Sequence, residues 1–274
     1  MALMVEKLCH IYSRGEPDEV KALSVEKIKI EPGEFVVIAG NSGSGKSTLL
    51  RYLAGLMKPT SGKIFMDDIE VRKTRDRIGL AVQSPERALF EKTLYDDVAF
   101  GLRNQCHSDS ETRAKALDAI RKVGLDEALL TCSPRSLSHG QKRLAALAGV
   151  IALEPRYLFL DEPTAGLDTW GRHRVIDALA RLNRDGMTIV AASHNMAHFS
   201  EVVSRLVILE SGKIWFDGEP DGLVSAEGLE SLGLSLPPSL TYARELLKRG
   251  IAVKWDVEPE KLAGVLGRTH ESRV

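Results

Sequence analysis

The sequence has little of what marks secreted or nucleic-acid-binding proteins. Its 274 residues include only three cysteines, Cys9, Cys106 and Cys132, which lie far apart and without the spacing of metal ligands. This excludes a disulfide framework and suits a reducing compartment. Lys and Arg number 37 against 38 Asp and Glu, a formal net charge of -1. A chain with balanced charges has no overall positive potential that attracts nucleic acid, so we expect no nucleic-acid partner.

Long apolar runs are also missing. The longest, Leu144 to Leu153, is about half of the ~20 residues that a helix needs to cross a bilayer. Glu6 and Lys7 interrupt the first ten residues, where a secretory signal would have an apolar core. We therefore expect a chain that is soluble by itself but able to dock on a membrane partner. Its length predicts one large domain with an appendage.

Apolar patterns predict an α/β core. Residues 25–31 (VEKIKIE) partly alternate, as in a half-exposed strand, whereas residues 35–40 (FVVIAG) are apolar throughout, as in a strand covered on both faces. Three more buried strands are predicted at 78–82, 157–160 and 188–193, each leading into a polar residue. Residues 47–57 have the periodicity of a helix, which Pro59 and Gly62 end.

The remaining segments predict the domain organisation. Residues 85–150 read as mostly helical, including SETRAKALDAIRKVGL at 110–125, and suggest a helical subdomain inserted into the core. The tetrapeptide SGKI occurs at 61–64 and 211–214 with unlike flanks, which indicates two similar turn-to-strand entries rather than a repeat. We expect a main domain over 1–220 and an accessory segment over 221–274. This segment is broken by Gly and Pro and is too short for a core of its own.

Residues 40–48 (GNSGSGKST) form a phosphate-binding loop, G-x-x-x-x-G-K-[ST], between a predicted strand and a predicted helix. The glycines let backbone N–H groups curl toward phosphates, Lys46 adds positive charge, and Ser47 offers a hydroxyl to Mg²⁺. The sequence therefore predicts a nucleotide site. Its members are Gly40, Asn41, Ser42, Gly43, Ser44, Gly45, Lys46, Ser47 and Thr48.

Polar residues follow three of the predicted strands. Asp161 and Glu162 come after strand 157–160, where Asp161 suits Mg²⁺ and Glu162 suits polarising an attacking water. An acidic helix cap would explain one acid but not two. Gln83 and His194 follow the other strands, at the edge where open α/β sheets place ligand contacts. Each alone is an ordinary loop residue, but together they predict a site along one edge.

Residues 136–149 (SLSHGQKRLAALAG) begin with a capping box, formed by Ser138 and Gln141. The turn is either a well-capped helix start and nothing more, or an anion site, because helix N-termini bind phosphate. Residues 40–48 already supply one phosphate nest. A second nest would face the nucleotide of another chain, which predicts a dimer.

The chain resembles the ABC transporter ATPase family over about residues 4–220. The resemblance rests on the order and spacing of GNSGSGKST, Gln83, LSHGQ, YLFLDEPTAGLD and His194. These correspond to its Walker A, Q-loop, signature, Walker B with D-loop, and H-switch. The resemblance implies a P-loop NTPase fold and two ATPase domains that sandwich two ATP molecules head to tail. Each signature turn then caps the γ-phosphate held by the opposite Walker A.

The resemblance also implies a role for each matching residue. Glu162, His194 and Gln83 would be catalytic, and Ser47, Gln83 and Asp161 would hold Mg²⁺. Ser138, His139, Gly140 and Gln141 would contact ATP from the signature turn, and Asp168 falls on the D-loop. Tyr12 falls where an aromatic residue stacks on adenine, although a lone early tyrosine is as compatible with packing.

A finer resemblance is to the energy-coupling-factor ATPases of vitamin and transition-metal importers. It rests on residues 83–102 (QSPERALFEKTLYDDVAFGL) and 232–250 (LGLSLPPSLTYARELLKRG). It implies ATP and Mg²⁺ as cofactors and a peripheral location at the cytoplasmic face of the membrane. The implied partners are a second ATPase subunit, identical or paralogous, a transmembrane coupling subunit and a substrate-binding membrane protein. The ATPase of another ABC transporter type and a soluble regulatory ABC ATPase are the alternatives.

Two residues depart from the family pattern. His139 stands where the signature usually has glycine, and Leu144 stands where a basic residue usually follows, with Arg143 one position earlier. The imidazole of His139 either crowds ATP or donates a hydrogen bond to it. Beyond Gln83, Leu89 and Phe90 form an apolar pair, which either packs into the helical subdomain or grips a helix of the membrane partner.

Overall fold

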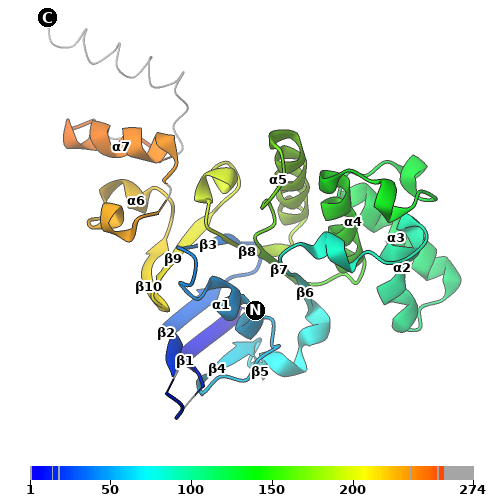
Figure 1. Ribbon diagram of the computed structural model, residues 1–274, viewed down its shortest axis with the longest axis horizontal. Coiled ribbons are helices and arrows are strands. Elements are labelled where there is room, and N and C mark those ends of the chain that lie inside the picture. Colours follow the sequence, from blue (N-terminus) through cyan, green and yellow to red (C-terminus); the bar gives the residue numbers. More distant parts are fainter. Residues whose placement is uncertain (1, 14, 18, 235, 252, 256–274) are drawn as a thin grey trace, which may run out of the picture.

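The computed structural model describes residues 2–13, 15–17, 19–234, 236–251 and 253–255. It combines a six-stranded sheet, a four-stranded antiparallel sheet, a group of helices at one end and a short helical segment near the C-terminus (Figure 1). The group of helices contains α2 to α4, and it lies at the opposite end of the molecule from the C-terminal segment (Figure 1).

The six-stranded sheet has the order β10-β9-β3-β8-β7-β6. All neighbouring pairs are parallel except β10 with β9. Its strands are β3 (Phe35–Ala39), β6 (Ile78–Ala81), β7 (Tyr157–Asp161), β8 (Thr188–Ser193), β9 (Arg205–Glu210) and β10 (Lys213–Gly218). The strands predicted at 35–40, 157–160 and 188–193 are confirmed.

Both faces of this sheet are covered. Along β3, Phe35 and Val37 join one apolar cluster, while Val36 and Ile38 join another. Because successive side chains of a strand point to opposite faces, the two clusters lie on the two sides of the sheet. Helix α5 (Thr169–Arg184) contributes to the first cluster and α1 (Lys46–Leu53) to the second.

Two predicted elements are shorter or less buried than the sequence indicated. β6 is an edge strand, so Ile78 and Leu80 stay partly exposed, and Val82 lies beyond the strand. Helix α1 ends at Leu53 and not at Met57. Gly55 follows with φ +67°, and a Cβ there would lie 3.0 Å from the carbonyl oxygen of Val71. The left-handed backbone conformation of Gly55 ends the helix, two residues after Leu53.

The four-stranded sheet, order β2-β1-β4-β5, is antiparallel. Its strands are β1 (Leu3–Tyr12), β2 (Val20–Ile30), β4 (Ser61–Met66) and β5 (Ile69–Glu70). The predicted half-exposed strand is confirmed, because Val25, Ile28 and Ile30 are buried between exposed charged residues. They pack in the same cluster as α1, so this sheet covers that face of the core.

The stretch from 85 to 150 is mostly helical, as predicted. It holds α2 (Leu94–Asn104), α3 (Asp109–Lys122) and α4 (His139–Ile151). Short 3₁₀ turns connect them: η3 (Pro85–Ala88), η4 (Glu127–Leu129) and η5 (Pro134–Ser136). Other 3₁₀ turns are η1 (Val71–Lys73), η2 (Arg75–Arg77) and η6 (Met196–Phe199).

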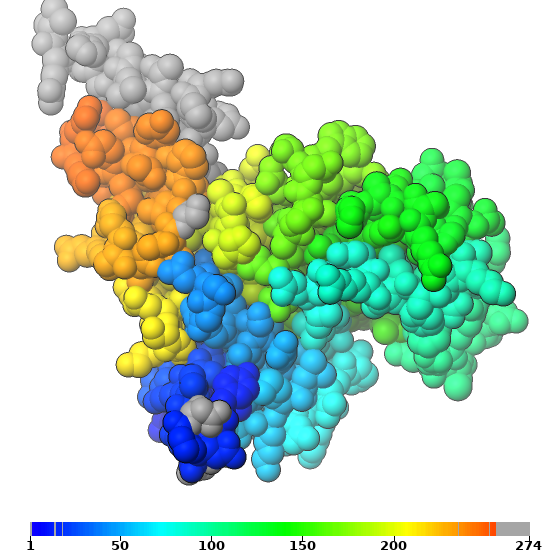
Figure 2. All heavy atoms as spheres, in the orientation of Figure 1, coloured from blue at the N-terminus to red at the C-terminus, as the bar shows by residue number. Residues whose placement is uncertain are grey.

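The described part of the C-terminal segment contains the helical elements α6 (Gly222–Ser225), η7 (Leu229–Leu232) and α7 (Pro238–Lys248), joined by short loops. Leu229 and Leu240 are buried in the same cluster as the main sheet. In Figure 2 the orange atoms of this segment lie against the yellow strands β9 and β10. Residues 256–274 of the predicted accessory segment lie outside the described residues. The domain boundary near 220 stays a prediction.

Candidate functional site

A groove of about 660 Å³ opens where several strands of the main sheet end. Predicted residues that line it come from the phosphate loop, from the ends of β6, β7 and β8, and from β1. They are Tyr12, Ser42, Gly43, Gly45, Lys46, Ser47, Thr48, Gln83, Glu162 and His194. Residues far apart in the sequence are thus brought to one place.

The phosphate loop has the curled backbone that its glycines allow. Gly43 and Gly45 have φ +80° and +103°. A Cβ at Gly45 would lie 2.8 Å from Leu23 Cδ2 and 2.9 Å from the carbonyl oxygen of Ala22. Only glycine therefore fits at this position. α1 begins here, and the free N–H groups of a helix start are suited to bind an anion in the groove.

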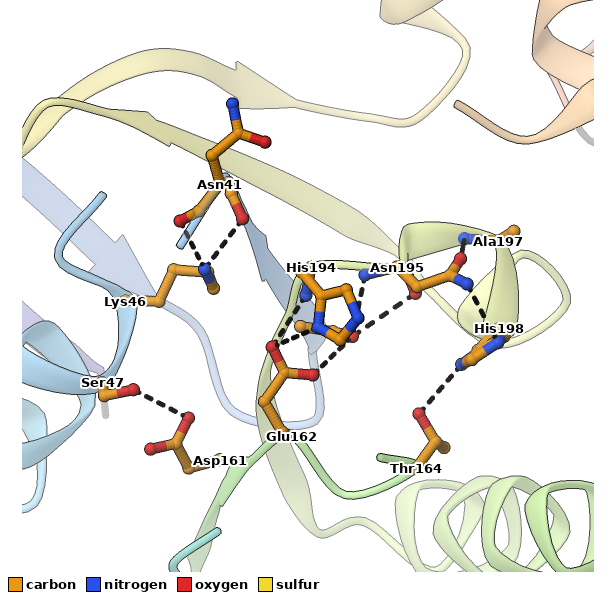
Figure 3. A network of polar contacts seen from close by, with 12 residues as sticks. Asn41, Lys46, Ser47, Asp161, Glu162, Thr164, His194, Asn195, Ala197 and His198 are labelled. Atoms are coloured by element: carbon orange, nitrogen blue, oxygen red, sulfur yellow. Dashed lines mark hydrogen bonds and ion pairs between the residues drawn. The ribbon is translucent and has the colours of Figure 1, made fainter. Parts of the chain in front are cut away.

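Lys46 lies within the loop rather than on the surface, with only 7% of its area exposed. Its Nζ donates to the carbonyl oxygens of Gly40 (2.8 Å) and Asn41 (2.9 Å) (Figure 3). Burial lowers the pKa of Lys46, and the nearby carboxylates of Glu162 and Asp161 oppose that shift. The ammonium group is thus held inside the loop, where Lys46 lines the groove.

The Ser47 hydroxyl donates to Oδ1 of Asp161 over 3.0 Å, which joins the start of α1 to the end of β7 (Figure 3). Gln83 lines the same groove from the segment after β6. Among the described residues, no group of three or more His, Cys, Asp or Glu side chains is arranged to hold a metal ion. A cation here would take its oxygen ligands from mixed sources, as Mg²⁺ does in nucleotide sites.

Glu162 is held by the residues that end β8. Its Oε1 accepts from the backbone N–H of His194 (2.9 Å) and lies 2.8 Å from His194 Nδ1. Its Oε2 accepts from the Ser193 hydroxyl over 3.2 Å (Figure 3). The Glu162 side chain is 12% exposed and that of His194 is 64% exposed. A carboxylate oriented this way is available to a water molecule in the groove.

Tyr12 lies at the rim of the groove and is 40% exposed. Its hydroxyl is 3.2 Å from the Thr48 hydroxyl, and the His10 ring meets it edge to face at 4.3 Å. These contacts fix the orientation of the ring while leaving it accessible. Its predicted contact with adenine stays a prediction.

The signature turn does not reach this groove. Ser138 caps α4 with both bonds of the predicted capping box: Gln141 N–H to Ser138 Oγ (3.2 Å) and Ser138 N–H to Gln141 Oε1 (2.8 Å). His139 is exposed at the first position of α4. None of the four signature residues lines the groove. Within one chain, the predicted site is therefore in two separate pieces.

Asp168 also lies outside the groove. Its Oδ1 accepts from the backbone N–H of Gly171 at 2.7 Å, which caps α5. A Cβ on Gly140 would lie 3.1 Å from the Cα of Gly171, so the N-termini of α4 and α5 pack against each other without side chains between them. The D-loop residue and the signature turn thus belong to one surface.

Sequence reasoning places Asn41 at the nucleotide and does not identify Thr164 or His198, because the contacts of these residues are non-local. The Asn41 side chain points away from the groove (Figure 3) and donates to the carbonyl oxygen of Leu232, in the C-terminal segment, at 2.6 Å. Thr164 Oγ1 lies 2.9 Å from His198 Nδ1, which supports the turn after Glu162. Burial, followed by Arg172 and His194, lowers the pKa of His198, and Glu162 opposes that shift, so the net effect favours the neutral ring.

Residues 23–165 match the family model described as ABC transporter. The chain belongs to the ABC transporter family. It is 41% identical to the energy-coupling factor transporter ATP-binding protein EcfA2 of Symbiobacterium thermophilum, over 95% of this chain and 92% of that protein. It is 39% identical to the protein of the same name from Clostridium tetani, over 94% and 93%.

Solved structures agree with this assignment. The structure of CbiO1 from Clostridium perfringens, part of the ABC transporter complex CbiONQ, has a TM-score of 0.75 and 32% identity, over 88% of this chain and 97% of that one. The dimeric post-hydrolysis state of the ATP-binding cassette MJ0796 with ADP and Pi has a TM-score of 0.70 and 29% identity, over 79% and 98%. This ABC ATPase therefore has the predicted P-loop NTPase fold, and ATP is its substrate.

Proposed function

We propose that this ABC ATPase binds ATP with Mg²⁺ in the groove at the strand ends, hydrolyses it in a head-to-tail dimer, and so energises an energy-coupling-factor importer. The observation that supports this most is that the groove and the signature turn lie apart on the same chain. Lys46, Ser47 and Glu162 line one groove, while the signature turn lies outside it on the same chain. Only a second ATPase subunit, identical or paralogous, brings a signature turn to the groove.

The residues present fit a magnesium ion. Ser47 and Asp161 face each other with hard oxygen atoms, and Gln83 adds an amide to the same groove. These three residues would hold Mg²⁺, which neutralises charge on the phosphates when bound. Lys46 and the backbone N–H groups at the start of α1 hold and orient the phosphates.

Glu162 acts on the attacking water. The carboxylate accepts a proton from water as the water oxygen bonds to the γ-phosphorus, and ADP leaves with the electron pair of the broken P–O bond. His194 and Ser193 keep the carboxylate in one orientation throughout this step. Release of inorganic phosphate from ATP by the purified chain tests this activity directly.

His139 sets the strength of the shared site. We expect His139→Gly to raise ATP-dependent dimerisation and turnover. His139 is exposed at the first position of α4, beside the free N–H groups that would receive the opposite γ-phosphate, and glycine at this position leaves more room for that phosphate. Light scattering with and without ATP measures the dimer. A loss of dimer or of turnover would show instead that the imidazole donates to phosphate.

The importer assignment rests on the relatives, which are named energy-coupling factor transporter ATP-binding proteins, and on CbiO1, which is part of a transporter complex. By analogy, a transmembrane coupling subunit and a substrate-binding membrane protein are the partners, and the chain works peripherally at the cytoplasmic face of the membrane. In the part of the chain that the structure describes, no helix has both the length and the apolarity to cross a bilayer. The selection of the cargo then falls to the membrane protein.

The segment after Gln83 offers a surface for the membrane partner. Leu89 packs against the main core, whereas Phe90 is 63% exposed and meets the exposed Phe100 ring at 4.9 Å. The predicted pair is thus divided: one residue anchors the segment and the other faces outward. Two adjacent exposed aromatic rings suit the apolar face of a helix.

We expect Phe90→Asp to leave ATP hydrolysis by the isolated chain unchanged and to abolish co-purification with the membrane partner. The charge removes an apolar contact without touching the groove. Tyr242→Asp is the matched control, because Tyr242 is similarly exposed but lies on α7, far from α2 (Figure 1). An intact complex with folded Phe90→Asp would contradict the docking site. Loss of hydrolysis together with binding would favour a packing role.

A further inference from the structure

Arg143 is a buried cation that joins three segments of the site. We infer that it is a positioning residue, which holds the turn carrying Glu162 and ties that turn to the segment after Gln83. The inference rests on the proposed role of Glu162 in hydrolysis. It concerns a residue of the signature helix α4 that lines no part of the groove.

The contacts of Arg143 come from different parts of the chain. One terminal nitrogen donates to the carbonyl oxygen of Ala165 at 3.1 Å, and the other donates a longer bond, 3.4 Å, to the carbonyl oxygen of Glu162. Nε lies 3.2 Å from Oε2 of Glu86, in η3. Arg143 is only 5% exposed, so water does not compete strongly for these contacts.

Arginine suits this position for a physical reason. Burying a charge is costly unless it is paired and hydrogen-bonded. Burial lowers the pKa of Arg143 and Glu86 opposes that shift, but a guanidinium stays charged in proteins. The planar guanidinium donates to two carbonyls while its Nε forms an ion pair with one carboxylate, an arrangement that a single ammonium group cannot make. The next residue, Leu144, is fully buried and serves packing alone.

The turn that Arg143 contacts needs support. Glu162 has φ +51°, a left-handed conformation that costs a residue with a side chain about 1 kcal/mol or more. The turn is closed by a bond from the Ala165 N–H to the carbonyl oxygen of Glu162 at 3.1 Å. Arg143 binds both ends of this turn. It therefore fixes the backbone of Glu162, while His194 and Ser193 fix the carboxylate.

The ion pair with Glu86 extends this support to the segment that carries Phe90. Glu86 lies between Gln83, which lines the groove, and Phe90, which faces outward. The side chains of Arg143 and Glu86 are 6% and 15% exposed. A displacement of this segment would therefore pull on the side chain that holds the backbone of Glu162.

Arg143→Met tests the inference, with steady-state kinetics and ATP affinity measured on the same sample. We expect kcat to fall by about 10- to 100-fold, because a small misplacement of a catalytic group costs rates of this order. ATP affinity and KM should change little, because the phosphate loop is untouched. In a Glu162→Gln background, Arg143→Met should cause no further loss, since it acts through Glu162.

Arg143→Lys is a second variant that keeps the ion pair with Glu86 and is expected to fold like the wild-type chain. We expect it to lower kcat by about 3- to 10-fold at an unchanged melting temperature. A wild-type kcat in folded Arg143→Lys would overturn the inference. It would also be overturned if Arg143→Met lowered kcat by the same factor in the wild-type chain and in the Glu162→Gln variant. If Glu162→Gln alone leaves kcat unchanged, the proposed role of Glu162 fails. If Glu162→Gln is slow while the Arg143 variants are fast, only the role of Arg143 fails.

Discussion

Replacing Glu162 with Gln is expected to lower ATP turnover by about 10² to 10⁴-fold while ATP still binds. The amide has nearly the same shape as the carboxylate, and it can still accept from the His194 N–H through its oxygen. It cannot take a proton from water. The phosphate loop, with Lys46 held by two carbonyl oxygens, is unaffected by this change.

Phosphate release and equilibrium ATP binding, measured on the same preparation, check this result. Glu154→Gln is the matched control. Glu154 precedes β7, whereas Glu162 follows it, so the two glutamates lie at opposite ends of one strand. The control should hydrolyse ATP at the wild-type rate. Unchanged turnover in Glu162→Gln would remove this residue from the mechanism.

Lys46→Ala is expected to weaken ATP binding by roughly 30-fold or more, because a hydrogen bond to a charged group contributes about 2 kcal/mol. The substitution removes the ammonium group from between the phosphates. Turnover should then be lost at ATP concentrations that saturate the wild-type chain. The core should remain folded, because the loop lies at its edge.

Lys21→Ala separates this effect from a general loss of positive charge. Lys21 lines the same groove but is exposed, so it contributes far less to phosphate binding. Titration with a fluorescent ATP analogue compares the two variants, and their melting temperatures report on folding. Wild-type affinity in Lys46→Ala would count against the groove as the nucleotide site.

The sequence predicted the elements whose causes are local. Residues 35–39 and 189–192 are apolar throughout because parallel strands are covered on both faces. The phosphate loop is defined by glycines at fixed spacing. β1 and β9 are not among the predicted strands. The apolar pattern of β1 is irregular, with a bulge between His10 and Ile11, and β9 follows no motif. The strand entry that SGKI indicates at 211–214 is confirmed by β10, which begins at Lys213.

Contacts between distant segments left no pattern in the sequence. Asn41 was assigned to nucleotide binding as a member of the phosphate loop, yet its side chain bonds to Leu232, 191 positions away. The sequence marks Arg143 only as a displaced basic residue, because its three contacts depend on how α4, η3 and the turn after β7 come together. Such roles become visible only once the chain is folded.

Mixing two inactive variants tests most directly whether ATP is hydrolysed in a site shared by two chains. Lys46→Ala damages the phosphate loop, and His139→Glu places a carboxylate on the signature turn, where it favours the helix start but repels the opposite γ-phosphate. Each variant alone should turn over ATP far more slowly than the wild-type chain. A mixed dimer contains one intact loop facing one intact signature turn. We predict that mixing restores phosphate release above the sum of the two variants. If the mixture were no faster than that sum, while the wild-type chain alone hydrolysed ATP, the shared site would be contradicted.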